Sequence, residues 1–253
     1  MAKRAIGIDI GGTGIKGALV DVKKGVLVSD RVRFETPEGG RPDDIAAVVT
    51  QLIEQIDGAR EHMPVGICFP AVVQHGRTMS AANISKEWID FDAAGLFERK
   101  LGRKVHVMND ADAAGVAEVH FGAAKDAKGL VMMTTLGTGI GTALFINGRL
   151  VPNTELGHLE IDGVDYETKA SFAAKERENL SFEAWAARLQ TYYSRVEALF
   201  SPDLIIVGGG VSKQHEQFLP LIKLRAKMVP AIKRNNAGIL GAAALAYRKQ
   251  EQE

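Results

Sequence analysis

The chain has 253 residues, of which 46% are hydrophobic and 25% charged, and its 31 basic side chains balance 31 acidic ones. This composition is ordinary for a globular protein, and the zero net charge argues against binding of nucleic acid or of a membrane surface. The one cysteine, Cys68, is expected to be a buried thiol, and it excludes an intrachain disulfide and a zinc site of the usual kind. No apolar run approaches the ~18 residues of a membrane span, and the first residues lack the apolar stretch of a signal peptide. Elimination therefore predicts a cytoplasmic protein.

The order of apolar runs and turn residues predicts an α/β protein. Turn-bounded apolar runs predict strands at 4–10, 15–22, 26–34, 65–69, 105–108, 130–136, 142–145 and 204–207. Helical spacing of apolar residues predicts helices at 43–56, 111–120, 182–200 and 239–247. The stretch 70–90 is rich in loop-forming residues, and a connection of that length is typical of a functional segment.

An internal repeat predicts the domain organisation. A strand, a glycine-rich turn and a second strand occur at 6–20 and again at 131–145. Each is followed by mixed helices and strands, which indicates a duplicated α/β domain with a cleft between the halves. We divide the chain into a small N-terminal domain, 1–109, and a large C-terminal domain, 110–238, and we expect the closing helix, 239–253, to pack on the small domain.

The first glycine-rich turn lies within the segment Asp9–Gly17. Glycines let a backbone turn sharply and point its N–H groups at an anion, and Asp9 at the strand end can hold Mg²⁺ directly or through water. The alternative is an ordinary glycine-rich hairpin, and the segment is neither a Walker A loop nor a Rossmann fingerprint. The candidate phosphate-binding residues besides Asp9 are Gly11, Gly12, Thr13, Gly14 and Lys16.

The second glycine-rich turn, within 134–142, repeats this pattern of hydroxyls and glycines between two strands. Two such hairpins in one chain indicate that they clamp one polyphosphate group from two sides. A third glycine cluster follows the predicted strand at 204–207 and would bring backbone close to a flat or charged ligand, unless it is a plain tight turn. The candidate residues in these two segments are Thr135, Gly137, Thr138, Gly139, Gly208, Gly209 and Gly210.

Two polar clusters have the residue types of an acceptor site. Asn109 and Asp110 stand at a strand-to-helix junction, where Asp110 can accept the proton of an attacking hydroxyl or can simply cap the helix. Glu155 and His158 flank a glycine, with Glu167 further on, and such groups can bind a diol. The alternatives there are surface charge for Glu155 and a core or capping role for His158.

These motifs together carry a family resemblance. The segments 9–17, 136–141 and 207–212 resemble the two phosphate motifs and the adenosine motif of the actin, hexokinase and Hsp70 superfamily. Asn109-Asp110, Glu155-x-Gly157-His158 and the Glu-x-x-Ala-Ser segment at 167–171 resemble the ROK family of bacterial sugar kinases and repressors. The resemblance implies two actin-like (ribonuclease H-like) α/β domains with an interdomain cleft.

Two departures refine the resemblance. The ROK family typically has a zinc-binding cysteine cluster that would fall in 159–166, where this chain has no cysteine, so no zinc is expected. The usual ROK phosphate loop carries a lysine directly after Gly-Gly-Thr, where this chain has Gly14, and Lys16 follows two residues later. These features and the short chain are similar to the polyphosphate glucokinases within the family.

That resemblance implies a hexokinase that uses inorganic polyphosphate, and ATP as a second donor, to phosphorylate the 6-hydroxyl of glucose, with mannose accepted in the glucomannokinase variant. It implies Mg²⁺ as cofactor and a monomer or homodimer. Asp110 would be the catalytic base. The alternatives are an ATP-only ROK kinase for another hexose and a non-catalytic sugar-binding regulator. The residues implied to contact the hexose are Asn83, Asn109, Asp110, Glu155, His158 and Glu167.

A polyphosphate donor also predicts a basic strip beyond the phosphate loops, because the donor is a long line of negative charge. The densest cationic stretch follows the glycine cluster at 208–210, which suggests that it lies on the donor side, although a solvated helix face is the alternative. Its members are Lys213, Lys223, Arg225, Lys227, Lys233 and Arg234.

Overall fold

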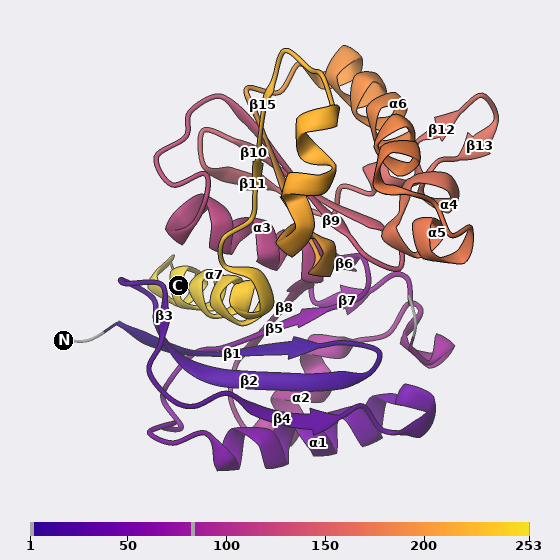
Figure 1. Ribbon diagram of the computed structural model, residues 1–253. Coiled ribbons are helices and arrows are strands. Elements are labelled where there is room, and N and C mark those ends of the chain that lie inside the picture. The colour runs from indigo at the N-terminus through magenta and orange to yellow at the C-terminus, as the bar shows by residue number, and fades with distance from the viewer. Residues whose placement is uncertain (1–2, 82–83, 253) are drawn as a thin grey trace. The chain divides into compact units, whose positions relative to one another are not determined.

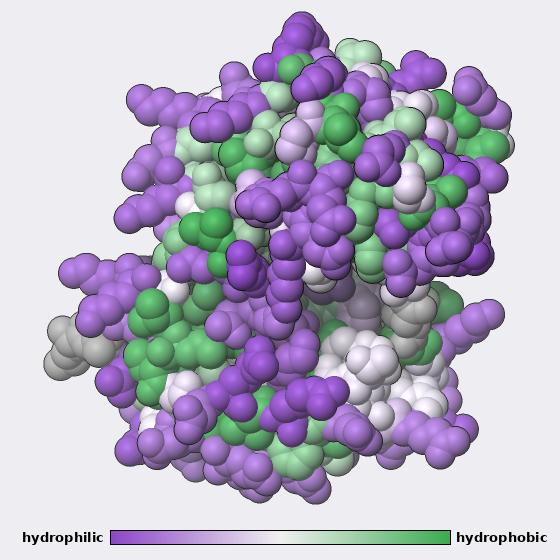
Figure 2. All heavy atoms as spheres, in the orientation of Figure 1, coloured by the Kyte–Doolittle hydropathy of each residue, from purple (hydrophilic) through white to green (hydrophobic). Residues whose placement is uncertain are grey.

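The computed structural model describes residues 3–81 and 84–252. The chain forms two compact units, and each has its own sheet and core. Unit 1 is Met1–Ala117 with Asn236–Glu253, and unit 2 is Glu118–Asn235. In the part of the chain that the structure describes, no helix has the length and apolar character needed to cross a bilayer. The visible face is mostly hydrophilic with small scattered apolar patches (Figure 2).

The sheet of unit 1 has the strand order β3-β2-β1-β5-β8, with β4 also paired to β2. β1 and β2 are antiparallel, whereas β1, β5 and β8 run parallel. The strands are β1 (Arg4–Ile10), β2 (Gly14–Asp21), β3 (Val26–Leu27), β4 (Val32–Glu35), β5 (Val65–Phe69) and β8 (Val105–Asn109).

Helices cover both faces of this sheet. α1 (Pro42–Gln55) and α2 (Ala93–Leu101) lie on one face and α7 (Ala237–Gln252) on the other (Figure 1). Gly7 and Gly66 are partners in the β1–β5 register, and a Cβ at either would lie 2.0 Å from a carbonyl oxygen of α7. The missing side chains therefore let α7 pack directly on the sheet backbone.

Two expectations for unit 1 were wrong in detail. The strand predicted at 26–34 is two strands, β3 and β4, because the Ser29 hydroxyl accepts the Leu19 N–H and interrupts the backbone ladder. The connection 70–90 is not structureless, since it holds the hairpin β6 (Val73–Gln74) and β7 (Arg77–Thr78) and the short helix η2 (Lys86–Trp88).

The sheet of unit 2 has the order β11-β10-β9-β14-β15. β9 and β10 are antiparallel, whereas β9, β14 and β15 run parallel. The order β10-β9-β14-β15 thus repeats β2-β1-β5-β8 with the same strand directions, so the duplication predicted from the two hairpins is present in the fold. The strands are β9 (Leu130–Leu136), β10 (Ile140–Ile146), β11 (Arg149–Val151), β14 (Leu204–Gly208) and β15 (Lys227–Pro230).

The core of unit 2 forms between this sheet and α6 (Phe182–Phe200). Trp185, Leu189 and Tyr193 are fully buried on the inner face of the helix. The Tyr193 hydroxyl lies 2.7 Å from the Thr134 hydroxyl, which satisfies both polar groups inside an apolar layer. α3 (Asp110–Phe121) crosses from unit 1 into unit 2. The remaining elements are η1 (Glu38–Gly40), η3 (Leu156–His158), β12 (Glu160–Ile161), β13 (Val164–Asp165), α4 (Glu167–Ala170), α5 (Phe172–Arg177), η4 (Gly210–Gln217), η5 (Leu219–Leu221) and η6 (Arg234–Asn236).

Candidate active site

The first glycine hairpin joins β1 to β2 in unit 1. The Gly11 N–H donates to the Gly14 carbonyl oxygen at 3.0 Å, which closes the turn. The Thr36 hydroxyl, just after β4, donates to the Gly11 carbonyl oxygen at 2.5 Å. Gly12 and Thr13, at the tip, are exposed. The turn is therefore held at its base and open at its tip.

Asp9 lies beside this turn with two close neighbours. It is the register partner of Lys16, whose Nζ is 3.8 Å from the Asp9 Oδ2. The Cys68 thiol donates to the Asp9 Oδ1 at 3.4 Å, and burial, followed by the charges of Asp9 and Asp110, raises the pKa of this thiol well above its ordinary value. Cys68 is fully buried, as predicted. The Asp9 side chain keeps 23% of its surface exposed, so an oxygen-preferring cation can reach it.

Asn109 and Asp110 stand at the start of α3. The sequence left open whether Asp110 caps this helix or is available as a proton acceptor, and the structure gives most of the capping to Asn109. The Asn109 side chain is 7% exposed and caps the helix, because its oxygen accepts the Asp112 N–H at 3.0 Å. Its amide also donates to the Ala71 carbonyl oxygen at 3.1 Å. Asp110 is the first helical residue and is exposed, and its Oδ1 accepts the Ala111 N–H at 2.8 Å. Capping therefore falls mainly to Asn109, which leaves the Asp110 carboxylate at the surface.

The second glycine hairpin joins β9 to β10 in unit 2. The Gly137 N–H donates to the Gly139 carbonyl oxygen at 3.0 Å. Glu167 supports the turn, since its Oε2 accepts the Ile140 N–H at 2.9 Å. A Cβ at Gly139 would lie 2.4 Å from that same carboxylate oxygen, so the position must be glycine for Glu167 to reach the strand. Thr138, at the turn, is exposed, and Thr135 is partly buried on β9.

The glycine cluster after β14 packs against this second hairpin. Gly208 is the parallel register partner of Thr135, at the same edge of the sheet as the hairpin. A Cβ at Gly209 would lie 2.2 Å from the Leu136 carbonyl oxygen, and the residue has a φ of 86°, which favours glycine. Apart from the two adjacent residues and the backbone of its own helix, none of the described residues has an atom within 4 Å of a Cβ built at Gly210. The cluster is thus both a tight turn and a neighbour of the hairpin.

The Glu155-x-Gly157-His158 segment forms η3 beside the same strand. A Cβ at Gly157 would lie 2.0 Å from the Ile140 carbonyl oxygen, so the glycine lets η3 pack on the start of β10. The Tyr192 hydroxyl donates to the Leu156 carbonyl oxygen at 3.1 Å and holds η3 from the α6 side. Withdrawal from solvent raises the pKa of Glu155, while His158 lowers it and Glu167 raises it.

His158 is oriented by two carboxylates. Its Nδ1 is 2.9 Å from the Asp165 Oδ2 and 3.8 Å from the Glu167 Oε1. The hydrogen bond to Asp165 raises the pKa of His158, burial lowers it, and the charges of Glu167, Asp165 and Glu155 raise it further. Because Nδ1 faces Asp165, Nε2 is the ring nitrogen left for a ligand. The three side chains His158, Asp165 and Glu167 offer metal-ligand atoms within 4.8 Å of one another, but Nδ1 is already engaged and we assign no ion there.

Lys227 of the predicted basic strip lies at the opposite end of its sheet from the Gly208–Gly210 turn. Lys227 begins β15 and pairs in parallel register with Leu204, at the amino end of β14, whereas the cluster Gly208–Gly210 follows the carboxyl end. Four strand residues, about 13 Å, separate the two levels. Lys223 and Arg225 precede Lys227 in sequence. The expectation was wrong for Lys227, because a parallel strand must return to the far edge of the sheet before it begins.

The other three cations of the predicted strip, Lys213, Lys233 and Arg234, come after the carboxyl ends of β14 or β15. The structure therefore divides the strip between opposite ends of the strands and does not form a continuous track from it.

Several site neighbours had no signal in the sequence. Asp165 holds His158, and Thr36 ties the end of β4 to the first hairpin. Arg33 on β4 lies against Gly14. Each contact joins residues on different strands or loops, so no local spacing could reveal it. The predicted sugar contact Asn83 lies outside the described residues.

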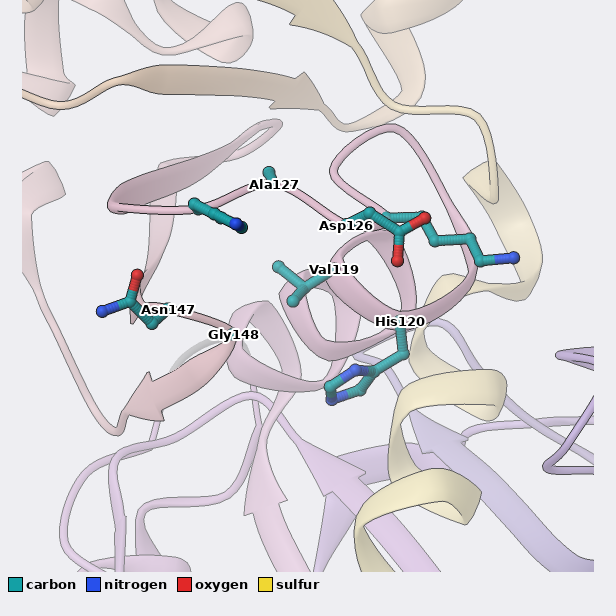
Figure 3. Close-up of a pocket in the computed structure, with 8 residues that line it drawn as sticks. Val119, His120, Asp126, Ala127, Asn147 and Gly148 are labelled. Carbon is teal, nitrogen blue, oxygen red and sulfur yellow. The ribbon is translucent and has the colours of Figure 1, made fainter.

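Two hollows in the described part of the structure lie away from these motifs. One, of about 390 Å³ in unit 2, is bordered by Val119 and His120 at the end of α3 and by Asn147 and Gly148 between β10 and β11 (Figure 3). Because Ile146 pairs with Leu130, the 147–148 turn lies at the opposite end of the hairpin strands from Gly137. The other, of about 330 Å³, lies in unit 1 beside Pro64, before β5.

Comparison with known proteins supplies the family context. A sequence model of the ROK family matches residues 5–179. The polyphosphate glucokinase of Mycobacterium tuberculosis is 42% identical over 242 residues, which cover 95% of this chain and 90% of the relative. The crystal structure of the inorganic polyphosphate/ATP-glucomannokinase from Arthrobacter sp. strain KM is 50% identical, with a TM-score of 0.91, and the match covers 98% of this chain and 99% of that one.

A ROK family glucokinase from Streptomyces griseus, solved with glucose and AMPPNP, is 27% identical with a TM-score of 0.79, and the match covers 97% of this chain and 99% of that one. These likenesses confirm the actin-like α/β fold predicted from the sequence.

Proposed function

This chain belongs to the ROK family, and from that premise we propose that it is a glucokinase that transfers a phosphoryl group from inorganic polyphosphate, and from ATP, to the 6-hydroxyl of glucose. The observation that carries the proposal is the likeness, over nearly the whole chain, to a polyphosphate glucokinase and to a polyphosphate/ATP-glucomannokinase. The second of these also makes mannose a candidate acceptor. A cytoplasmic location fits substrates of this kind.

The sugar side of the reaction rests on the exposed Asp110 and on the η3 segment. The Asp110 carboxylate would take the proton of the 6-hydroxyl as the hydroxyl oxygen attacks the terminal phosphorus. His158 would form a hydrogen bond with a sugar hydroxyl through Nε2, because its Nδ1 is already hydrogen-bonded to Asp165. Glu155 and Glu167 would accept hydrogen bonds from other hydroxyls, and Glu167 has one oxygen left after it accepts the Ile140 N–H.

Asn109 has a more indirect part in this proposal. Its buried amide already bonds Ala71 and Asp112. Its main effect would be to fix the first turn of α3, and with it the direction of the Asp110 carboxylate. Any hydrogen bond from Asn109 to the sugar would use the second N–H or the second oxygen lone pair of its side-chain amide.

The donor side rests on the two glycine hairpins. Their exposed tips, at Gly12–Thr13 and at Thr138, would present backbone N–H groups and hydroxyls to phosphate oxygens. Mg²⁺, held by Asp9 directly or through water, would neutralise charge on the transferring phosphoryl group. Asp9 fits such an ion because its carboxylate is partly exposed and its Oδ2 has Lys16 only at 3.8 Å.

A kinetic comparison of Asp110→Asn with the unmodified protein tests the proposal. Glucose 6-phosphate formation is measured with long-chain polyphosphate and with ATP, using glucose and then mannose as acceptor. We expect Asp110→Asn to lower kcat by about 10²–10⁴-fold with little change in the KM for glucose, because an amide is a poor proton acceptor. Asp44→Asn, an exposed position in the first turn of α1, is the matched control and should behave as the unmodified protein.

Two results would overturn parts of this proposal. Near-normal kcat in Asp110→Asn would remove Asp110 as the base. Failure of the unmodified protein to phosphorylate glucose with either donor would reject the glucokinase function itself.

A further inference from the structure

Arg33 on β4 lies against the first glycine hairpin, although it is far from the hairpin in sequence. β4 lies beside β2 (Figure 1). In the register of this pair, Arg33 is opposite Lys16 and Glu35 is opposite Gly14. A Cβ built on Gly14 would lie 3.1 Å from both the Nε and the Nη2 of Arg33. The guanidinium group therefore occupies the space that a side chain at position 14 would take.

The charge of Arg33 has no carboxylate partner among residues 3–81 and 84–252. Its register partner Lys16 differs in this respect, because the Lys16 Nζ lies 3.8 Å from the Asp9 Oδ2. Arg31, which precedes β4, donates to the neutral side chain of Asn236 at 3.3 Å. Arg33 is also exposed. It is thus an unneutralised cation at the base of a turn whose tip is open.

The position of Arg33 relative to the hairpin is fixed by two links. The backbone ladder between β2 and β4 covers residues 14–17 and 32–35. The Thr36 hydroxyl donates to the Gly11 carbonyl oxygen, on the other side of the turn. Both links fix the backbone that carries Arg33 beside the turn. A planar guanidinium at this place can give two parallel hydrogen bonds to one phosphate group.

We propose that Arg33 binds the phosphate oxygens of the phosphoryl donor and supplies, from β4, the cation that Gly14 cannot supply. This inference rests on the proposed kinase function. Both donors end in the same terminal phosphoryl group, so Arg33 serves polyphosphate and ATP alike. The competing interpretation is that Arg33 only covers Gly14 and contacts no ligand.

The test compares Arg33→Ala, Arg33→Lys and the double variant Gly14→Lys/Arg33→Ala. In the double variant the new lysine enters the space that the guanidinium has left, and Gly14 does not have a positive φ that would oppose a side chain. Arg99→Ala is the matched control, because Arg99 is an exposed arginine of unit 1 on α2. Thermal unfolding without ligand confirms that each variant is folded.

We expect Arg33→Ala to lower kcat/KM for both donors by about 10–100-fold, the usual effect of losing a hydrogen bond to a charged group, with the KM for glucose unchanged. The fall in kcat/KM should be smaller in Arg33→Lys, and the double variant should recover part of the kcat/KM lost in Arg33→Ala. Arg99→Ala should have the kcat/KM of the unmodified protein. Unchanged donor kinetics in Arg33→Ala, or an equal loss in Arg99→Ala, would overturn the inference.

A binding measurement separates this inference from the kinase function. Inorganic tripolyphosphate should raise the Tm of the unmodified protein and raise it much less in Arg33→Ala, because a ligand stabilises the state that binds it. If the protein phosphorylates no sugar but the Tm shift depends on Arg33, the kinase function fails and the phosphate site stands. If glucose is phosphorylated and neither the kinetics nor the Tm shift depends on Arg33, the kinase function stands and the role of Arg33 in phosphate binding fails.

Discussion

Replacing Asp165 with asparagine should lower the pKa of His158. The hydrogen bond from His158 to Asp165 is the largest cause of the raised pKa, and the two atoms are 2.9 Å apart. The side chains are 55% and 41% exposed, so water screens the pair. Exposed pairs of this kind are worth about 0.2–1 kcal/mol, so the expected fall in the pKa of His158 is modest. Glu167 remains 3.8 Å from the His158 Nδ1, and its charge still raises the pKa of His158 in the variant.

The same change has a defined effect on stability. A histidine whose pKa is raised in the folded state contributes stability that is fully present below its unfolded pKa, about 6.5, and is lost as the pH rises through the folded pKa. The Tm difference between the unmodified protein and Asp165→Asn should therefore be largest near about pH 5.5 and should vanish near about pH 8.5.

NMR titration of the imidazole protons measures the pKa directly. Six histidines are present, so the His158 signals are assigned by their loss in His158→Gln. Asp165→Ala is the companion variant, because asparagine can still accept the Nδ1 proton whereas alanine cannot. An unchanged or higher pKa in Asp165→Asn, or a Tm difference that grows with pH, would refute the reasoning.

Two further variants test the packing and the charge placement. Gly157→Ala should destabilise the protein by about 1–3 kcal/mol and lower its Tm by about 2–12 °C, because the new Cβ would clash with the Ile140 carbonyl oxygen. Gly137→Ala is the control and should leave the Tm unchanged, because there is open space around its Cβ. Equal losses of Tm in the two variants would contradict the packing argument. Changing Lys223, Arg225 and Lys227 together to glutamine should leave the KM for polyphosphate and for ATP unchanged, since Lys227 pairs with the far end of β14. A selective rise for polyphosphate would show that this cluster binds the donor after all.

Local turn and capping chemistry made much of the fold predictable. The helix predicted at 182–200 has the observed bounds, because Ser181 accepts the Ala184 N–H at its start and Ser201 adopts a left-handed conformation at its end. The glycine hairpins were predictable for the same reason, since each turn is closed by bonds among its own residues. α2 was missed, although Asp92 and Gly102 cap it, because it has only 9 residues and so offers few apolar positions to reveal a helical spacing.

The sequence by itself determined the family, the duplicated α/β fold and the residue types of the two glycine hairpins, because these depend on contacts within a few residues of the chain. Only the tertiary structure decided that Asp165 orients His158, that Asn109 rather than Asp110 accepts the Asp112 N–H, and that Arg33 fills the space beside Gly14. Strand register and helix packing set those neighbours. The same register separates Lys227 from the Gly208 turn, which nearness in sequence had placed together.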